Sequence, residues 1–467
     1  MIPLAADAET RRLLEGINPS GAVGMDTQHR ADELLARAAW SRMAEPGDRV
    51  AGVLIALIGA PALLAHLVAG STPAEIAADA WRDPAEARGS ALDPRAVRAA
   101  VERWKPRRSH TATLHDLELA AGARLKLLIP GDPHWPEQLN DLGDHAPLAL
   151  WIRGDPRTLQ AHGLAVVGAR ASSGYGENVT AEIVGGVCDA GAAIVSGAAY
   201  GIDAVAHRAA LAAGATTIAV LAGGADRAYP AAHATLIDRI AEQGAVCSEI
   251  IPGGAPTRWR FLQRNRVIAA LAAATLVTEA GTRSGSLNTA GHTAELGRPL
   301  GAVPGPVNSG TSAGCHRLIR EYGAVLVTNA ADACELAGLD TVGLLDEAAG
   351  PDRPPPLHRR LVDALPLRGA RELSDAARRA GMSLDEARAT VAELELLGVV
   401  ERRAIDRGER AGEEGWALGA GGRGVILGWR MGDGVNDNPE AITFIPKVMW
   451  LTFGTVDPCL RIAMQSP

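Results

Sequence analysis

The middle of the chain alternates between short apolar runs and helical stretches, and this alternation constrains the fold more than any other feature. The apolar runs, most of them followed by a glycine-rich loop, read LAVVGA, AAIVSG, TTIAVLAGG, AVCSEI, TLVTEA and LGAVPG. Such a pattern is typical of parallel strands connected by helices that cover both faces of one sheet. We therefore predict a Rossmann-like, doubly wound, mostly parallel α/β fold over residues 115–338.

The regions on either side follow other patterns. Residues 28–110 contain short helical stretches separated by glycine-bearing turns, which predicts a small helical domain of the SAM or helix-hairpin-helix kind. Residues 339–357 are acidic and then proline-rich, as in a linker. Residues 358–418 show three helical stretches and a closing hairpin, with Ser383 as the expected N-cap of the third helix. This order indicates a winged-helix domain.

The two ends of the chain carry little pattern. We expect residues 1–27 to be a disordered leader, and Met25 is a candidate translation start because a helical pattern begins just after it. Residues 419–467 lose the alanine richness of the rest of the chain. We assign this tail neither a fold nor a function.

One apolar stretch, residues 50–70, is long enough to span a bilayer. Gly59-Ala60-Pro61 interrupts it, which predicts two short buried helices instead. No basic segment followed by an apolar run begins the chain, so we expect no signal peptide. The five cysteines form no CxxC motif, which favours reduced thiols. We expect a cytoplasmic protein without a membrane partner.

The charge balance limits how this chain contacts nucleic acid. It has 46 basic and 54 acidic residues, a formal net charge of -8. This excludes a protein that coats nucleic acid with its entire surface, but it allows a local basic groove.

Four glycine-rich loops, 167–176, 196–203, 223–230 and 279–288, follow predicted strands. In a doubly wound sheet, such loops gather at the carboxyl ends of the strands, where backbone N–H groups and helix N-termini favour anions. None contains GxGxxG or GxxxxGK[ST], which disfavours a dinucleotide dehydrogenase and a P-loop ATPase. The alternative for each loop is a tight strand-to-helix turn.

An arginine-rich run, PTRWRFLQRNRVIAA, follows the fourth apolar run. Its basic residues are Arg258, Arg260, Arg264 and Arg266, with Trp259 and Phe261 between them. Arginines bind phosphates bidentately and aromatic rings stack on unpaired bases. Together with Arg170 and Arg283, the run predicts a groove that follows phosphates. The alternative is a solvated helix face anchored by two rings.

Signs of catalysis are few. The chain has no GxSxG and no HExxH motif. Asp203 and His207 lie four residues apart, and His292 and Glu295 three apart. Both spacings suit a metal or an acid–base pair, but capping and helix-surface hydrogen bonds explain them more simply. We predict no catalytic residue and no metal site.

Several long motifs occur in a fixed order: SGAAYGIDAVAH, GGADRAYP, SEIIPG, RFLQRNRVIAALA, TRSGSLNTAGHTAELGR and VPGPVNSGTSAGCHRLI. This block resembles the bacterial DNA-processing protein A family (DprA, also called Smf) over residues 115–335, and the flanking regions fit the family's layout. The resemblance implies a single-stranded-DNA-binding homodimer that protects incoming strands in natural transformation or recombination. It also implies loading of the RecA recombinase, with no cofactor and no catalytic step.

The resemblance also assigns residues. The implied DNA-binding set is Gly168, Arg170, Ser196, Gly197, Tyr200, Gly201, Arg264, Asn265, Arg266, Arg283, Ser284, Gly285 and Ser286. The implied dimer surface contains His316, Leu318 and Ile319. Two positions depart from the family: Tyr200 replaces a lysine and Leu262 replaces a proline. A tyrosine at the first position is able to stack on a base.

Two other functions stay open at this point. The first is a nucleotide-processing hydrolase of the phosphoribohydrolase kind, although EAGTRSGS lacks the paired glycine and trailing glutamate of PGGxGTxxE. The second is an assembly scaffold with empty loops. Residues 357–418 hold 11 arginines against 12 acidic residues, so we expect the winged helix to contact a protein partner instead of DNA.

Overall fold

The computed structural model describes residues 6–18, 27–81, 92–339, 355–366, 369–404 and 414–419. The chain divides into two compact units, Met1–Ala348 and Ala349–Pro467. The expectations about Met25, the tail beyond Gly419 and nearly all of the linker fall outside the described residues.

The first unit contains a nine-stranded sheet in the order β1-β2-β6-β5-β4-β3-β7-β8-β9. Its strands are β1 (Lys126–Leu128), β2 (Leu150–Gly154), β3 (Gly163–Gly168), β4 (Ala193–Ser196), β5 (Thr217–Val220), β6 (Ala245–Ser248), β7 (Ala274–Glu279), β8 (Leu300–Ala302) and β9 (Val325–Leu326). In the order of the sheet, every neighbouring pair from β6 through β5, β4, β3, β7 and β8 to β9 is parallel. β1 and β2 add an antiparallel edge that the apolar pattern did not predict.

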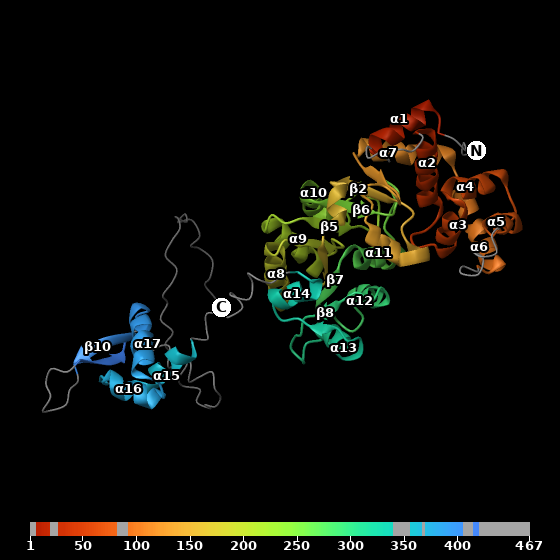
Figure 1. Ribbon diagram of the computed structural model, residues 1–467. Coiled ribbons are helices and arrows are strands. Elements are labelled where there is room, and N and C mark those ends of the chain that lie inside the picture. The colour runs from red at the N-terminus through yellow and green to blue at the C-terminus, as the bar shows by residue number, and fades with distance from the viewer. Residues whose placement is uncertain are drawn as a thin grey trace, which may run out of the picture. The chain divides into compact units, whose positions relative to one another are not determined.

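Helices cover both faces of this sheet (Figure 1). They are α8 (Gly174–Asp189), α9 (Ile202–Ala212), α10 (Ala234–Gln243), α11 (Arg258–Leu271), α12 (Ser286–Glu295), α13 (Ala313–Glu321) and α14 (Ala330–Ala337). Neighbouring strand residues point to opposite faces, so Val167 packs in a core with α11 to α13, while Val166 packs with α8, α9 and α14. The predicted α/β class with a mostly parallel sheet is confirmed.

The strand order reverses next to β3. From β3 the chain continues through β4, β5 and β6 on one side, and it then returns to place β7, β8 and β9 on the other side. Ligands of doubly wound sheets bind at such a reversal, outside the carboxyl ends of the strands. The topology therefore directs attention to the loops after β3, β4 and β7.

Within the described residues, seven α-helices precede the parallel sheet strands. They are α1 (Ala8–Ile17), α2 (Thr27–Met43), α3 (Arg49–Ile58), α4 (Ala60–Ala69), α5 (Pro73–Ala80), α6 (Pro94–Trp104) and α7 (His110–Gly122). The expectation of a disordered leader is wrong for α1, because Leu14 and Ile17 are buried in a core shared with α2 and α7. Asp7 caps this helix by accepting a hydrogen bond from the Thr10 amide.

The apolar stretch at residues 50–70 forms two helices, as predicted. Among the described residues, no single helix is long and apolar enough to cross a membrane, and only the pair α3 and α4, bent by 106°, meets that standard jointly. Gly59 takes a positive φ of 82° at the bend, which favours glycine. Residues such as Leu54 and Leu63 are buried in a core with Trp40 and Trp104.

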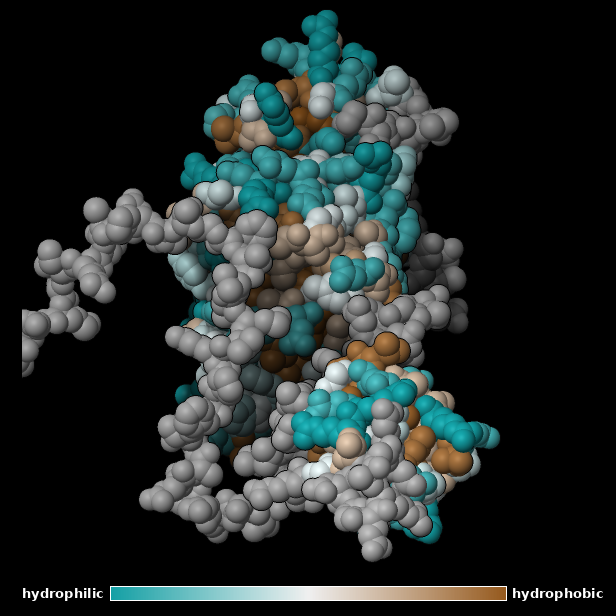
Figure 2. All heavy atoms as spheres, turned by 90° about the vertical axis from the view of Figure 1, so that its left-hand side faces the viewer, coloured by the Kyte–Doolittle hydropathy of each residue, from teal (hydrophilic) through white to brown (hydrophobic). Residues whose placement is uncertain are grey.

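The described part of the second unit contains three helices and a two-stranded sheet. These are α15 (Pro356–Ala364), α16 (Leu373–Ala380), α17 (Leu384–Leu396), β10 (Val400–Ala404) and β11 (Glu414–Leu418). Ser383 caps α17 as predicted, in a capping box with Glu386. Leu396 and Leu397 are exposed, and Figure 2 shows hydrophobic areas among the hydrophilic side chains of this unit.

Candidate functional site

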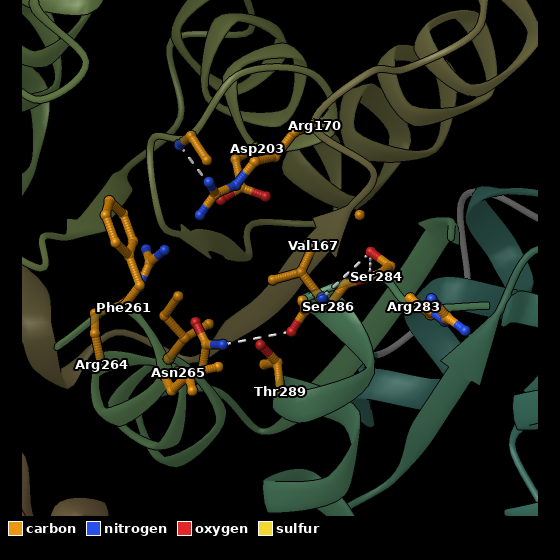
Figure 3. A pocket seen from close by; sticks show the side chains of 15 residues that line it. Val167, Arg170, Asp203, Phe261, Arg264, Asn265, Arg283, Ser284, Ser286 and Thr289 are labelled. Atoms are coloured by element: carbon orange, nitrogen blue, oxygen red, sulfur yellow. Dashed lines mark hydrogen bonds between the residues drawn. The ribbon is translucent and has the colours of Figure 1, made fainter. Parts of the chain in front are cut away.

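A cavity of about 350 Å³ lies where the strand order reverses. It is lined by Val167, Gly168, Arg170, Ala199, Asp203, Phe261, Leu262, Arg264, Asn265, Ile268, Arg283, Ser284, Gly285, Ser286 and Thr289. These residues come from the end of β3, from the loops after β3, β4 and β7, from the first turns of α9 and α12, and from one face of α11. Figure 3 shows Arg283 on the opposite side of the cavity from Phe261 and Arg264.

Arg264 is buried in the wall of the cavity. Its Nη1 donates a hydrogen bond of 2.8 Å to the carbonyl oxygen of Val220, and its Nε has no partner. A Cβ on Gly197 would lie only 1.5 Å from Nη1, so the guanidinium packs directly on this glycine. Burial lowers the pKa of Arg264 to about 10, against the stabilising charge of Asp203. The arginine therefore stays protonated at neutral pH.

Asp203 is the carboxylate that faces this arginine. It is the second residue of α9 and accepts a 3.4 Å hydrogen bond from the Ala199 amide, while Gly201 takes the N-cap position. Burial raises the pKa of Asp203 above its usual value, and the charge of Arg264 partly opposes that rise. Among the described residues that line the cavity, Asp203 is the only acidic one.

Arg170 and Phe261 form the mouth of the cavity. The Arg170 guanidinium lies 4.9 Å from the centre of the Phe261 ring, and that of Arg264 lies 5.8 Å from it. Arg170 is exposed, and no carboxylate lies within ion-pair distance of it in the described part of the chain. A cation held beside a ring in this way presents charge and an aromatic face to the same ligand.

The N-terminus of α12 opens at the same cavity. Gly285 is its N-cap, and the Ser286 amide makes only a long hydrogen bond of 3.4 Å, to Ser284 Oγ. By contrast, a carboxylate of the protein already lies at the N-terminus of α8, because Glu279 accepts a 2.8 Å hydrogen bond from the amide of the N-cap residue Ser173. An anion is able to replace the long bond at α12 and gain from the helix dipole.

Asn265 connects α11 to this loop. Its Nδ2 donates a hydrogen bond to the Gly285 carbonyl oxygen at 3.4 Å (Figure 3). It donates another to Asn288 Oδ1 at 3.1 Å. The side chain therefore holds the loop after β7 against α11.

The structure brings most of the predicted site residues together at the cavity. Those that line it are Gly168, Arg170, Arg264, Asn265, Arg283, Ser284, Gly285 and Ser286. Gly197 and Gly201 support it from behind: a Cβ on Gly201 would lie 2.1 Å from the Ala169 carbonyl oxygen. Ser196 is buried and donates a 2.6 Å hydrogen bond to the Val166 carbonyl oxygen, which is a contact within the sheet.

Arg266 lies away from the cavity, which corrects its predicted role in binding. It is buried and pairs with Glu249 at 2.6 Å. Arg260 is likewise held by Glu45, which accepts two hydrogen bonds of 3.0 Å from it. The two arginines thus fix α11 to carboxylates elsewhere in the first unit, and the run does not form one continuous basic face.

The two candidate metal or acid–base pairs have simpler roles in the structure. His207 Nδ1 lies 2.7 Å from Thr217 Oγ1, and burial lowers the pKa of His207 to about 3. His292 and Glu295 form a 3.0 Å contact on the surface of α12, which is the simpler alternative. Within the described residues, no group of three or more His, Cys, Asp or Glu is placed to hold a metal ion.

Sequence reasoning missed several residues that shape the cavity. Phe261 stood in the arginine-rich run but entered no binding set, and Asp203 appeared only as a metal or capping candidate. Leu262, Ile268 and Thr289 were also missed. For α11, the signal was the spacing of three and four residues that places Phe261, Arg264 and Ile268 on one helix face.

Comparison with known proteins finds relatives for the region that contains the sheet and the cavity. The family described as DNA recombination-mediator protein A matches residues 126–338. A protein of Mycobacterium tuberculosis named as DNA processing protein DprA is 43% identical over 318 residues, covering 64% of this chain and 80% of that protein. The chain belongs to the DprA/Smf family. DprA of Streptococcus pneumoniae is 43% identical over 201 residues, covering 43% of this chain and 70% of its own length.

The fold agrees with this membership. The X-ray structure of DprA from Streptococcus pneumoniae superposes with a TM-score of 0.51 at 30% identity and covers 66% of this chain and 98% of that chain. The family match at residues 126–338 includes every residue that lines the cavity.

Of the dimer surface that the DprA resemblance implies, the structure corrects only Leu318, and the roles of His316 and Ile319 stay predictions. Leu318 is buried in the sheet core with Cys315 and cannot reach a partner. His316 hydrogen-bonds the Gly305 carbonyl oxygen, and Ile319 packs partly against the same core.

Proposed function

We propose that this chain binds single-stranded DNA, with a backbone phosphate seated in the cavity at the strand reversal. The observation that carries the proposal is the cavity's charge. Exposed Arg170 and Arg283 stand on different walls, buried Arg264 faces the only acidic lining residue of the described part, and the α12 N-terminus opens between the loops. In a family of DNA recombination mediators, the anion that fits this arrangement is a nucleic-acid phosphate.

Preference for a single strand follows from the rings next to these arginines. Phe261 lies against Arg170, and Tyr200, which contacts His233 at a centroid distance of 4.8 Å, is half exposed beside lining residue Ala199. Unpaired bases expose their faces to such rings, whereas the bases of a duplex stack on each other.

We propose binding without catalysis and without a cofactor. Asp203 is buried in the cavity wall, where its charge interacts with that of Arg264, and this supports a role in setting the charge of the cavity and not in transferring protons to a ligand. A hydrolase would need an acid or base within hydrogen-bond reach of its substrate.

The remaining partners are proposals of the same kind. We propose that the chain acts in the cytoplasm, in natural transformation or homologous recombination, and loads RecA on the strand it binds.

We further propose a homodimer through the edge strand β9, where Val325 and Leu326 are exposed and the sheet ends. A change of molar mass on substituting both residues with lysine, measured by light scattering, tests this contact.

The flanking domains complete the proposal. We propose that the helices of residues 28–110 form a SAM-like domain and that α15 to α17 with β10 and β11 form a winged-helix domain. Helix α17 carries Asp385, Glu386, Glu393 and Glu395 against Arg388. This acidic balance supports a protein partner for the winged helix.

Fluorescence anisotropy of a labelled single strand of about 30 nucleotides tests the central proposal, at low and moderate salt. We expect salt-sensitive binding of the single strand, weaker binding of a duplex, and a loss of at least about 100-fold in affinity for Arg170→Glu. Arg320→Glu, on the exposed surface of α13, is the matched charge control. Equal binding by Arg170→Glu and the control would place the site elsewhere.

A further inference from the structure

The exposed aromatic rings of the first unit are unevenly distributed. Four tryptophans, Trp40, Trp104, Trp135 and Trp151, are fully buried, but Trp259 is 57% exposed. All four tyrosines of the chain are about half exposed, and Tyr175, Tyr200 and Tyr229 follow β3, β4 and β5 respectively. Because carboxyl ends of parallel strands meet at one edge, these rings share the edge that holds the cavity.

Tyr229 extends the wall of the cavity outward. Its ring centre lies 5.6 Å from that of Phe261, with the planes tilted by 54°. Phe261 itself lines the cavity beside Arg170. A ligand that leaves the cavity past Phe261 therefore meets the half-exposed face of Tyr229 next.

Trp259 lies on α11 just before the residues of this helix that line the cavity. It lies on the first turn of α11, three residues before Leu262, which lines the cavity and is itself exposed. Side chains three residues apart are neighbours on a helix surface. The indole therefore continues the α11 wall beyond the mouth of the cavity.

Positive charge accompanies both rings. Arg227 precedes Tyr229 by two residues and Arg258 precedes Trp259, and both arginines are exposed. Arg227 has Asp226 at 3.6 Å, but that carboxylate also accepts a 2.8 Å hydrogen bond from the Gly253 amide. Exposed rings beside exposed arginines suit a polyanion whose bases carry aromatic faces.

The size of the cavity requires such a continuation. Its volume of about 350 Å³ is at the lower end of the range of about 300–1,000 Å³ for small-molecule sites. Single-strand sites commonly span about 4–16 nucleotides. Most of a bound strand must therefore lie outside the cavity, on its rim.

We propose that Tyr229 and Trp259 form a stacking platform for the bases of a DNA single strand as it leaves the cavity between β5 and α11. The platform rests on the proposed function, because the cavity supplies the phosphate contact that holds the strand in register. It is a binding surface of its own, since neither ring lines the cavity.

The test uses the full chain and three matched variants. Tyr229→Leu/Trp259→Leu removes both rings, Tyr229→Phe/Trp259→Phe keeps a ring at each position, and Arg170→Glu removes the phosphate contact. Each is titrated with an oligothymidine of about 20 nucleotides and with an abasic strand of the same length.

We expect the double leucine variant to bind oligothymidine at least about tenfold more weakly than the wild type, because stacking of each base contributes independently. The double phenylalanine variant should stay within about threefold of the wild type. Against the abasic strand, which has no bases, wild type and both ring variants should bind equally.

Two results would overturn the platform. Equal oligothymidine affinity of the leucine variant and the wild type would show that the rings contribute nothing, and an equal loss on the abasic strand would show a structural defect. The fluorescence of Trp259, taken as the difference between the wild type and Trp259→Phe, gives a second readout. Oligothymidine should quench this fluorescence, and the abasic strand should not. Loss of binding in Arg170→Glu with unchanged ring variants would reject the platform and keep the proposed function.

Discussion

The two sides of α11 use the same residue type for opposite purposes. On the cavity side, Arg264 lines the cavity, and both Arg264 and Arg170 lie beside the Phe261 ring. On the other side, Arg260 and Arg266 are paired with Glu45 and Glu249. The comparison shows that, in the described part of the chain, Arg170 and Arg264 form no ion pair with a carboxylate, whereas Arg260 and Arg266 do.

The largest effect that follows from this comparison is on stability. Arg266→Met should lower the free energy of unfolding by about 3–5 kcal/mol, because it leaves Glu249 buried without its partner. Arg170→Ala, an exposed residue, should cost about 1 kcal/mol or less. Urea unfolding measures both changes in stability. In anisotropy titrations the order should be reversed, with Arg170→Ala losing more DNA affinity than Arg266→Met.

Arg266→Met/Glu249→Leu is the matched control for this effect. Replacing both members of a buried pair by apolar residues is often neutral, so the double variant should recover most of the stability. If Arg266→Met alone is as stable as the wild type and weakens DNA binding, the assignment of Arg266 to a structural ion pair instead of to the DNA site is wrong.

A smaller effect is expected from the carboxylate in the cavity wall. Asp203→Asn should raise single-strand affinity severalfold at a pH where the carboxyl group is ionised, because an ionised carboxylate repels a phosphate. Burial raises the pKa of Asp203. Protonation on acidification therefore removes that repulsion, and the wild-type affinity should approach that of the variant as the pH falls.

Anisotropy titrations of both proteins from alkaline to acidic pH measure this convergence, which should lie above the usual carboxyl range because burial raises the pKa of Asp203. Asp238→Asn, an exposed residue paired with Arg153 outside the cavity, is the control. A constant ratio between Asp203→Asn and the wild type across this range contradicts the assigned role of Asp203.

The smallest effect concerns Arg260. Glu45→Gln should destabilise the chain by about 1 kcal/mol, since this pair is partly exposed to solvent. Single-strand affinity should change by less than about twofold, because Arg260 does not line the cavity. A clear gain of affinity in anisotropy would mean that Glu45 withholds Arg260 from the strand.

The sequence predicted the sheet and the position of the site because both depend on local pattern. The apolar runs mark the strands, and glycine loops after parallel strands must meet at one edge, which brings Arg170 and Ser284 together. Helix α1 and the antiparallel edge strands β1 and β2 lie outside that alternation, and they were not predicted.

The sequence could not predict which arginines of α11 line the cavity and which pair with carboxylates, and the reason is physical. Glu45 lies 215 residues before Arg260, and nothing local indicates that it approaches α11. Leu318 is different: Gly314, Cys315 and Leu318 follow the spacing of a buried helix face, so its place in the core was open to prediction. The family resemblance had placed it on the dimer surface instead.

Amide hydrogen exchange with and without an oligothymidine strand tests the central claim most directly. The account predicts slower exchange in the bound state over residues 168–176 and 284–289, which contain the loop after β3 and the N-terminus of α12. Slower exchange confined to residues 373–416 of the second unit, with the cavity loops unchanged, would contradict it.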